Sequence, residues 1–199
     1  SGLRSYLSTL RVDMSNLYLV DIICHGVPGP KVWQDYLAYA EKKYDGKVTA
    51  VDFRDKLKFG WSGHRESLRI GDKTVYPETY SMLFCKNIMF RESCSVCPFA
   101  NLQRPSDITI GDLWGWEKID PSLNKDDKGA SLVLLNTQKG KDLFDKIGTT
   151  INSSKIDVRD CLQHNLQQPT VFHPKSKQFE EDYAKHGFEY VAKKYGAMG

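Results

Sequence analysis

The sequence has no uninterrupted apolar run of about 18 residues, the length that predicts a membrane-spanning helix. It also lacks the charged, apolar and small-residue regions of an N-terminal secretion signal. The net charge is only +3 in 199 residues, and no basic stripe interleaves with aromatic residues, so a nucleic-acid partner is not expected. These absences predict a cytoplasmic protein with no membrane span.

Several common active-site signatures are also missing. Neither G-x-G-x-x-G nor G-x-x-x-x-G-K-[ST] occurs, so the usual phosphate-binding loops are absent. No Ser-His-Asp arrangement and no H-E-x-x-H motif supports a hydrolase. The cysteines number five, and this odd count is a poor fit to a disulfide framework. In a reducing cytoplasm, a Cys-x-x-Cys pair instead indicates metal binding or redox chemistry.

The residues that are present predict a mixed α/β fold. Hydrophobic residues make up 40% of the chain and charged residues 27%, as in ordinary globular proteins. The apolar run Leu17–Cys24 predicts a strand that is buried on both faces. Pro30 and apolar residues at three- and four-residue steps predict a helix over Lys31–Tyr44. Further predicted elements are helices at Leu3–Leu10, Tyr80–Phe90, 138–147 and Phe179–Tyr195, strands at Lys47–Phe53, Asp107–Ile110 and 130–137, and a hairpin around Gly71 and Asp72.

This pattern predicts a central mixed sheet with flanking helices in one domain. The chain begins without Met, and "SGLRSYLSTL" already shows helical periodicity. We therefore expect a single-domain fragment of a longer protein.

Cys94 and Cys97 form a Cys-x-x-Cys pair within "RESCSVCPFANLQRPSDITIGDLWGW". Their spacing puts two thiols on one turn, whereas a tetrahedral zinc site or a cubane cluster needs four ligands. Cys24 ends the predicted buried strand beside a Gly/Pro-rich loop, a place where ligands collect in open α/β sheets. Cys85 and Cys161 are expected to pack as small apolar side chains. On spacing alone, metal or cluster binding ranks first, packing of two buried thiols second and disulfide exchange third.

Two other segments carry candidate binding residues. In "FRDKLKFGWSGH", cations that include Arg54 and Lys56 surround a flexible aromatic turn, so they could bind an anionic cofactor, but a solvated loop explains them more simply. In "GDLWGW", Asp112 and two indoles, Trp114 among them, could wall a planar cofactor or could belong to a core. His25 could be a ligand, a proton donor or a residue that caps its loop, and the last role is favoured.

Four segments in a fixed order together resemble a known family. They are "DIICHGVPGPKVWQDYL", "FRDKLKFGW", "FRESCSVCPFANLQRPSDITIGDLWGW" and "KGASLVLLNTQKG". From about Leu3 to Gly140 the chain resembles the C-terminal domain of the coenzyme F-420 hydrogenase/dehydrogenase beta-subunit family. The resemblance implies an iron–sulfur flavoprotein oxidoreductase. In such proteins FAD passes electrons between a 4Fe-4S cluster and a hydride carrier, which is a deazaflavin in the namesake enzymes.

The resemblance also implies roles for particular residues. Cys24, Cys94 and Cys97 would be cluster ligands, with a fourth ligand outside this chain. Family members carry an upstream ferredoxin-like segment and a "G-T-P-C-Q"-type motif, and "SGLRSYL" is similar to the segment directly after that motif. The implied flavin-side residues are Arg54, Lys56 and Trp61, followed by Asp112 and Trp114.

The implied domain covers residues 1–199 as a C-terminal domain of this type, with a helical tail over 160–199. A ferredoxin-type domain or protein would be its electron partner, and the fragment alone is expected to be inactive. The alternative is a non-catalytic zinc-binding or protein-docking module built on Cys94 and Cys97. A third possibility, a flavin-free relative acting on a saccharide, has no catalytic constellation to support it.

Overall fold

The computed structural model describes residues 2–148 and 150–196, which form a mixed α+β fold. The fold class predicted from the sequence is therefore confirmed. The chain divides into two compact units, although one unit was expected, and each unit has its own hydrophobic cluster. Unit 1 comprises Ser1–Cys24, Pro98–Asn124 and Ala130–Gln168, and unit 2 comprises His25–Cys97, Lys125–Gly129 and Pro169–Gly199.

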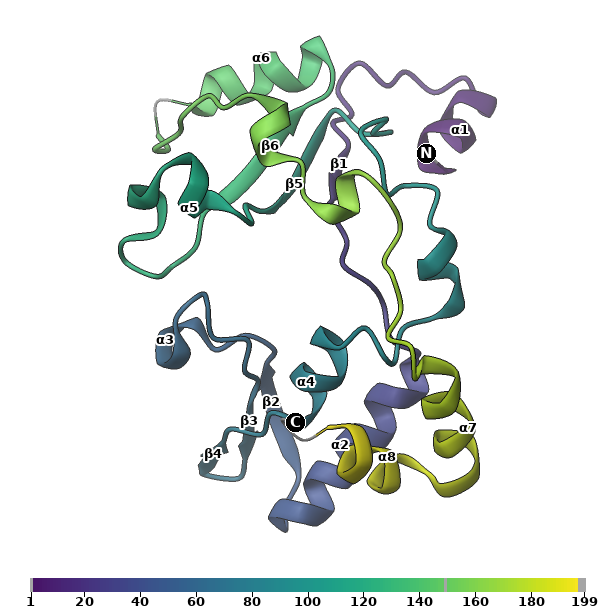
Figure 1. Cartoon of the computed structure of the whole chain (residues 1–199). Helices are drawn as coiled ribbons and strands as arrows, with labels where there is room; N and C mark the ends of the chain where they lie inside the picture. Colours follow the sequence, from purple (N-terminus) through teal and green to yellow (C-terminus); the bar gives the residue numbers. More distant parts are fainter. Residues whose placement is uncertain (1, 149, 197–199) are drawn as a thin grey trace. The chain divides into compact units, whose positions relative to one another are not determined.

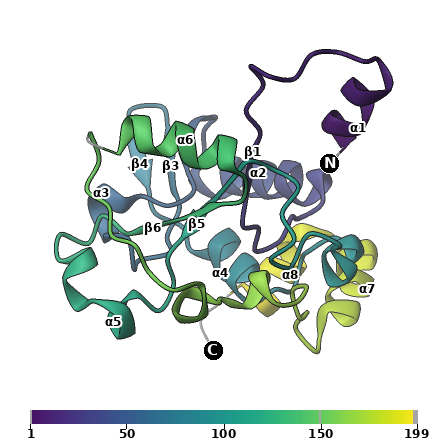
Figure 2. The same ribbon diagram turned by 90° about the horizontal axis from the view of Figure 1, so that it is seen from above.

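Unit 1 is built on a mixed three-stranded sheet. Its strands are β1 (Val20–Ile22), β5 (Ile108–Asp112) and β6 (Ser131–Leu135), in the order β1-β5-β6. β1 runs parallel to β5, and β6 runs antiparallel to it. Figure 1 and Figure 2 both show α6 (Gln138–Ile147) beside β6. The Thr137 hydroxyl accepts a hydrogen bond from the Gly140 amide and so caps this helix.

The first strand differs from its prediction. The run Leu17–Cys24 was expected to be a strand buried on both faces, but β1 has three residues and lies at the edge of the sheet. Val20 and Ile22 are 55% and 62% exposed. An apolar run can indicate a strand covered on both faces, but whether its faces are covered depends on which other elements pack on the sheet.

Unit 2 contains an antiparallel sheet of β2 (Val48–Asp52), β3 (Ser67–Ile70) and β4 (Lys73–Val75). The predicted hairpin around Gly71 is confirmed, since this glycine joins β3 to β4 with a φ of 56°. Four helices accompany the sheet: α2 (Pro30–Tyr44), α4 (Thr79–Cys85), α7 (Ser176–His186) and α8 (Phe188–Tyr195). Side chains from these helices and from β3 form the core, which includes Tyr36, Leu68, Leu83, Phe179 and Val191.

Two predicted helices are shorter or divided. The helix expected over Tyr80–Phe90 ends at Cys85, and Asn87 then takes a left-handed conformation with a φ of 54°. The helix expected over Phe179–Tyr195 is interrupted at Gly187, whose φ is 77°. The helices of this last segment contribute core residues to unit 2. The remaining elements are α1 (Gly2–Thr9), α3 (Lys56–Phe59), α5 (Trp116–Ile119) and four 3-10 turns at Glu92–Val96, Pro121–Asn124, Val158–Cys161 and His164–Leu166.

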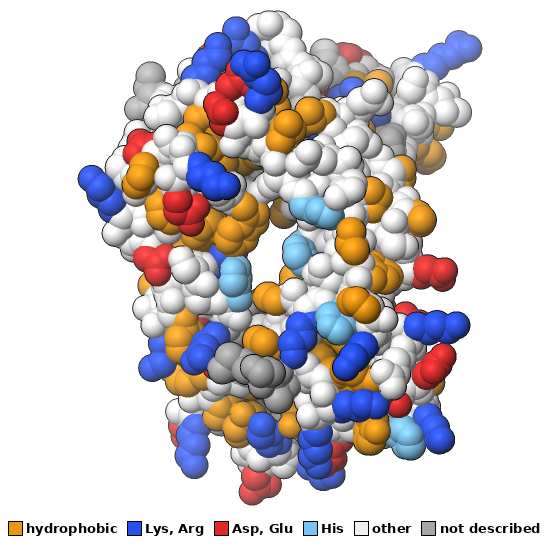
Figure 3. All heavy atoms as spheres, in the orientation of Figure 1, with side chains coloured by type: hydrophobic (Ala, Val, Ile, Leu, Met, Phe, Trp, Pro, Cys, Tyr) orange, Lys and Arg blue, Asp and Glu red, His pale blue; other side chains and the backbone are white. Residues whose placement is uncertain are grey.

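Surface composition agrees with the small net charge. On the face drawn in Figure 3, lysine and arginine side chains are interspersed with acidic, hydrophobic and uncharged ones. Within residues 2–148 and 150–196, no helix has the length and apolar character needed to cross a membrane.

A buried carboxylate organises unit 2. Glu66 is 1% exposed, and its Oε1 accepts hydrogen bonds from the Tyr36 hydroxyl and the Tyr80 amide, each at 3.0 Å. Its Oε2 accepts a hydrogen bond from the Ser81 amide at 3.1 Å and another from the Ser81 hydroxyl. Burial, together with the nearby Glu66 charge, raises the pKa of Tyr80 to about 12. Glu66 therefore joins α2, β3 and the first turn of α4.

A second buried carboxylate organises unit 1. Asp107 is 4% exposed and accepts hydrogen bonds from the Leu19 amide and the Thr137 hydroxyl, both at 2.9 Å. The Arg4 guanidinium lies 3.3 Å from the same carboxylate. Burial alone would raise the pKa of Asp107, but these hydrogen bonds and the charges of Arg4 and Lys139 outweigh it, so the pKa is lowered.

We expect Asp107→Asn to weaken the acid dependence of stability. Because the native pKa is lowered, the ionised carboxylate stabilises the fold above its unfolded pKa of about 4. That contribution is lost as the pH falls from about 4 through the native pKa. The variant should have a free energy of unfolding about 2 kcal/mol lower at neutral pH. That free energy should also fall less steeply with decreasing pH than in the wild type. Urea unfolding from pH 7 to pH 3 measures both quantities. Asp145→Asn, at an exposed position on α6, is the control, and identical slopes for wild type and Asp107→Asn would contradict the assignment.

Candidate functional site

Cys94 lies on a short 3-10 turn in unit 2, and Cys97 directly follows the last residue of that turn. The turn spans Glu92–Val96, and the Cys94 amide donates to the Arg91 carbonyl at 2.9 Å. Cys94 and Cys97 are both half-buried. The Val27 amide donates a hydrogen bond to Cys94 Sγ at 3.3 Å. Backbone N–H groups directed at cysteine sulfur are among the features that set the potential of thiolate-bound clusters.

The segment that carries Val27 is fixed beside the cysteine turn. Pro28 forms an antiparallel bridge with Phe90, and the Arg91 amide donates to the Val27 carbonyl at 3.0 Å. Gly26 permits this close approach, because a Cβ there would lie 2.5 Å from the Phe90 ring. The backbone of this loop thus delivers the Val27 N–H to Cys94 Sγ.

His25 holds the same loop from the other side. Its Nε2 lies 2.7 Å from Asn87 Oδ1, and its ring stacks on Phe84 with centroids 5.2 Å apart. The Thr170 hydroxyl donates to the His25 carbonyl. These contacts confirm the expected loop-capping role of His25.

Cys24 belongs to unit 1 and is exposed. It precedes Val27 by three residues, so chain connectivity alone keeps their Cα atoms within about 11 Å of each other. A donor set of thiols suits zinc or an iron–sulfur cluster, and Cys94 with Cys97 fits two ligands of such a group. Among the described residues, however, no three histidine, cysteine, aspartate or glutamate side chains are grouped so that they could hold a metal ion. The described residues therefore do not supply a complete set of ligands.

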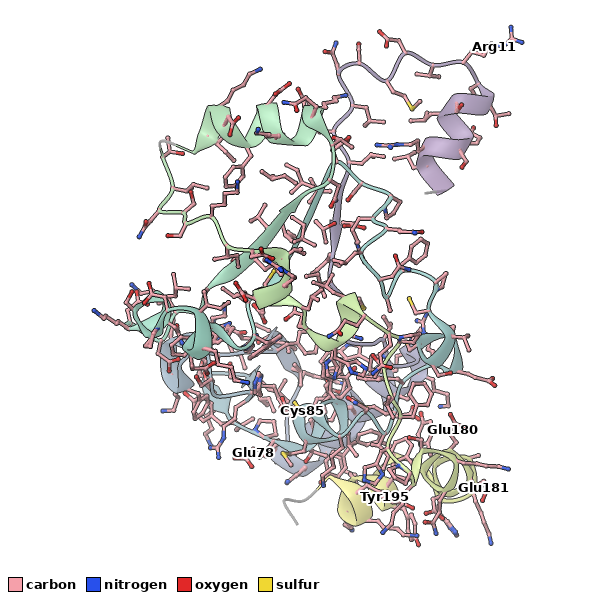
Figure 4. The ribbon with its side chains drawn as sticks, turned by 45° about the horizontal axis from the view of Figure 1, so that its top comes forward. Arg11, Glu78, Cys85, Glu180, Glu181 and Tyr195 are labelled. Carbon is pink, nitrogen blue, oxygen red and sulfur yellow. The ribbon has the colours of Figure 1, made fainter. Side chains whose placement is uncertain are left out.

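The other two cysteines behave differently from each other. No disulfide joins any of the five cysteines, all of which lie in the described ranges. Cys161 is 3% exposed in the hydrophobic cluster of unit 1, and burial raises its pKa, so its predicted packing role is confirmed. The packing role predicted for Cys85 is wrong, because this residue is exposed at the last position of α4 (Figure 4). Leu83 and Ile88 fill the core in this region instead.

Arg54 and Trp61 contact each other in unit 2. Arg54 Nη2 donates to the Trp61 carbonyl at 2.6 Å, and its guanidinium lies 5.1 Å from the centroid of the Trp61 ring. The indole is only 2% exposed and lies against the backbone of Gly129. Lys56, at the first position of α3, is exposed. The Trp61 ring is therefore too buried for a flavin to stack on it in this structure, whereas Lys56 is exposed.

We expect Gly129→Ala to destabilise unit 2 by about 3 kcal/mol. The φ of Gly129 is 93°, and a Cβ would lie 2.3 Å from the Trp61 ring, so left-handed strain and overpacking add. Gly71→Ala is the matched control, since Gly71 also has a positive φ but a Cβ there has open space. Gly71→Ala should lower the free energy of unfolding, measured in urea, by only about 1 kcal/mol. Equal losses for the two variants would show that the Trp61 contact contributes nothing.

The tryptophan pair of "GDLWGW" divides between surface and core in unit 1. Asp112 ends β5 opposite Ser131 and is half-buried. Trp114 is 42% exposed, and its amide donates to Gln163 Oε1 at 3.4 Å. Trp116 packs against the hydrophobic cluster of unit 1. The exposed indole of Trp114 therefore fits a role beside a planar cofactor, and the indole of Trp116 fits a role in the core.

A buried arginine beside the cysteine motif was not predicted from the sequence. The side chain of Arg104 is 3% exposed and pairs with Asp21, with Nη2 2.8 Å from Oδ2. Arginine is seldom buried unless it is paired. The only available signal was its position in "CPFANLQRPSD", seven residues after Cys97.

Comparison with known proteins identifies the family. The family model that matches residues 1–160 describes the C terminus of the beta subunit of coenzyme F420 hydrogenase/dehydrogenase. A search of curated proteins found no match. The matched region covers most of the chain and contains both cysteine segments and "GDLWGW". The chain therefore belongs to the family formed by the C-terminal part of the beta subunit of coenzyme F420 hydrogenases and dehydrogenases, which are oxidoreductases.

Proposed function

We propose that this chain is the electron-transfer and flavin-binding domain of an iron–sulfur flavoprotein oxidoreductase. The observation that carries the proposal is the Val27 N–H donated to Cys94 Sγ, within a Cys-x-x-Cys turn of a redox family. When bound, a 4Fe-4S cluster supplies one-electron carriage, and FAD supplies exchange between single electrons and a hydride. The hydride carrier on the far side of the flavin would be a deazaflavin or a similar molecule.

Cys24, Cys94 and Cys97 are the proposed metal ligands from this chain. A fourth ligand would come from elsewhere, because a cubane cluster needs four. The Val27 N–H would stabilise negative charge on Cys94 Sγ. The pairing of Pro28 with Phe90 would hold that donor in place.

Lys56 and Trp114 are the most accessible of the proposed flavin-side residues. The exposed ammonium of Lys56 suits a pyrophosphate oxygen, and the exposed indole of Trp114 suits stacking on a planar ring. Asp112 could accept a hydrogen bond from a ring N–H or a ribose hydroxyl. Arg54 and Trp61 would contribute less directly, because they contact each other and Trp61 is buried against Gly129.

We further propose that residues 1–199 act as the C-terminal domain of a longer redox protein. A ferredoxin-type domain or protein would exchange electrons with it. The chain by itself would be inactive, because it supplies only part of the proposed ligand set.

Anaerobic reconstitution of the full-length protein with iron, sulfide and FAD tests this proposal. We expect broad visible absorbance from the cluster together with the flavin bands, and we expect both to bleach on reduction. The competing function, a zinc-binding or docking module, predicts one zinc ion per chain and no chromophore. That second outcome would overturn the proposal.

A further inference from the structure

Arg104 binds two separate chain segments of unit 1 with a single guanidinium group. Its Nη2 donates to Asp21 Oδ2 at 2.8 Å and to the Ile22 carbonyl at 3.1 Å, both on β1. Its Nη1 donates to the carbonyl of Phe99 and, at 3.4 Å, to that of Asn101, both in the loop after Cys97. The guanidinium therefore bridges β1 and this loop.

The two bridged segments are the ones that lead to proposed metal ligands. Ile22 lies two residues before Cys24, and Phe99 lies two residues after Cys97. Two residues of extended chain span at most about 7 Å. Each proposed ligand is therefore tethered by a short stretch of backbone to a carbonyl that Arg104 holds.

The burial of this ion pair indicates a role in positioning rather than in stability. The Arg104 side chain is 3% exposed and that of Asp21 is 23% exposed. Among the described residues, Arg104 Nε and Asp21 Oδ1 are buried without a hydrogen-bond partner. A buried ion pair with unsatisfied atoms stabilises a fold poorly compared with apolar side chains of similar volume. The planar fork of arginine, however, can fix several acceptors in one geometry.

We propose that Arg104, paired with Asp21, is a positioning residue that sets the separation between Cys24 and Cys97. The inference rests on the proposed function, in which these two cysteines are ligands of one metal group. The arginine itself touches neither the metal nor a substrate. Its effect reaches the cysteines through the carbonyls of Ile22 and Phe99.

Thiol crosslinking in the metal-free full-length protein tests the inference. A short bifunctional thiol reagent is applied in a Cys94→Ser background, so that Cys94 cannot compete, and mass spectrometry quantifies the peptide pair that joins Cys24 to Cys97. We expect Arg104→Ala to lower the crosslinking rate about tenfold, because the effective concentration of one thiol near the other falls. Arg104→Lys should lower the crosslinking rate about threefold. Lysine keeps the positive charge but cannot donate hydrogen bonds to the Ile22 and Phe99 carbonyls in the fixed geometry of a guanidinium.

The matched control is Arg159→Ala, which removes an exposed arginine paired with Asp157 in the same unit. It should leave the rate unchanged. A wild-type rate in folded Arg104→Ala would overturn the inference, and if that variant does not fold, a wild-type rate in Arg104→Lys would overturn it. Failure of the wild-type protein to bind iron, with the Arg104 effect intact, would overturn only the proposed function, because the crosslinking assay contains no metal.

Discussion

Glu66→Ala is expected to lower the free energy of unfolding of unit 2 by about 3–5 kcal/mol. The substitution removes the acceptor of four hydrogen bonds and leaves the Tyr80 and Ser81 amides buried at the start of α4. Each orphaned buried donor costs about 1–3 kcal/mol, and the lost side chain adds a cavity term. Urea unfolding followed by circular dichroism measures the loss.

Two variants separate the hydrogen bonds from the lost volume. Glu66→Gln keeps the size of the side chain and one acceptor oxygen, so its loss should be roughly half that of the alanine variant. Glu180→Ala removes an exposed glutamate of α7 and should leave stability unchanged (Figure 4). A Glu66→Ala protein as stable as wild type would show that the buried network contributes nothing.

Cys94→Ser is expected to lower the iron bound by the reconstituted full-length protein about tenfold or more. Metal binding requires the deprotonated ligand, and a serine hydroxyl does not ionise near neutral pH as a thiol can. The Val27 N–H would also lose its sulfur acceptor. Iron and acid-labile sulfide per chain, measured after anaerobic desalting, give the result.

Cys85→Ser is the matched control for that measurement. Cys85 is an exposed thiol at the end of α4 and lies outside the proposed ligand set. Its replacement should leave the iron content at the wild-type level. Equal iron contents in the Cys94 and Cys85 variants would contradict the role assigned to Cys94.

Elements with local signals could be predicted from the sequence. Pro30 begins α2, and Gly71 supplies the left-handed turn between β3 and β4. These signals act within a few residues, so the letters alone were enough. The prediction of a strand buried on both faces at Leu17–Cys24 was wrong, because the exposure of Val20 and Ile22 depends on whether distant parts of the chain pack on the faces of the sheet. No local pattern of residues encodes that packing.

The candidate site shows the same division. The turn that carries Cys94 and Cys97 was predicted from spacing, and the loop-capping role of His25 was predicted from its Gly-rich context. The donor to Cys94 Sγ could not be predicted, because it is a backbone N–H 67 residues away in the sequence. Arg104 was missed for a related reason, since its carboxylate partner Asp21 is 83 residues distant.

Low-temperature electron paramagnetic resonance of the reduced full-length protein tests the central claim most directly. In the proposed function, the thiolates of this domain, Cys94 and Cys97 among them, hold a redox-active iron–sulfur cluster. We predict the signal of one reduced 4Fe-4S cluster per chain in the wild-type protein and its loss in Cys94→Ser. A reduced protein that gives no such signal while it binds one zinc ion per chain would contradict the claim.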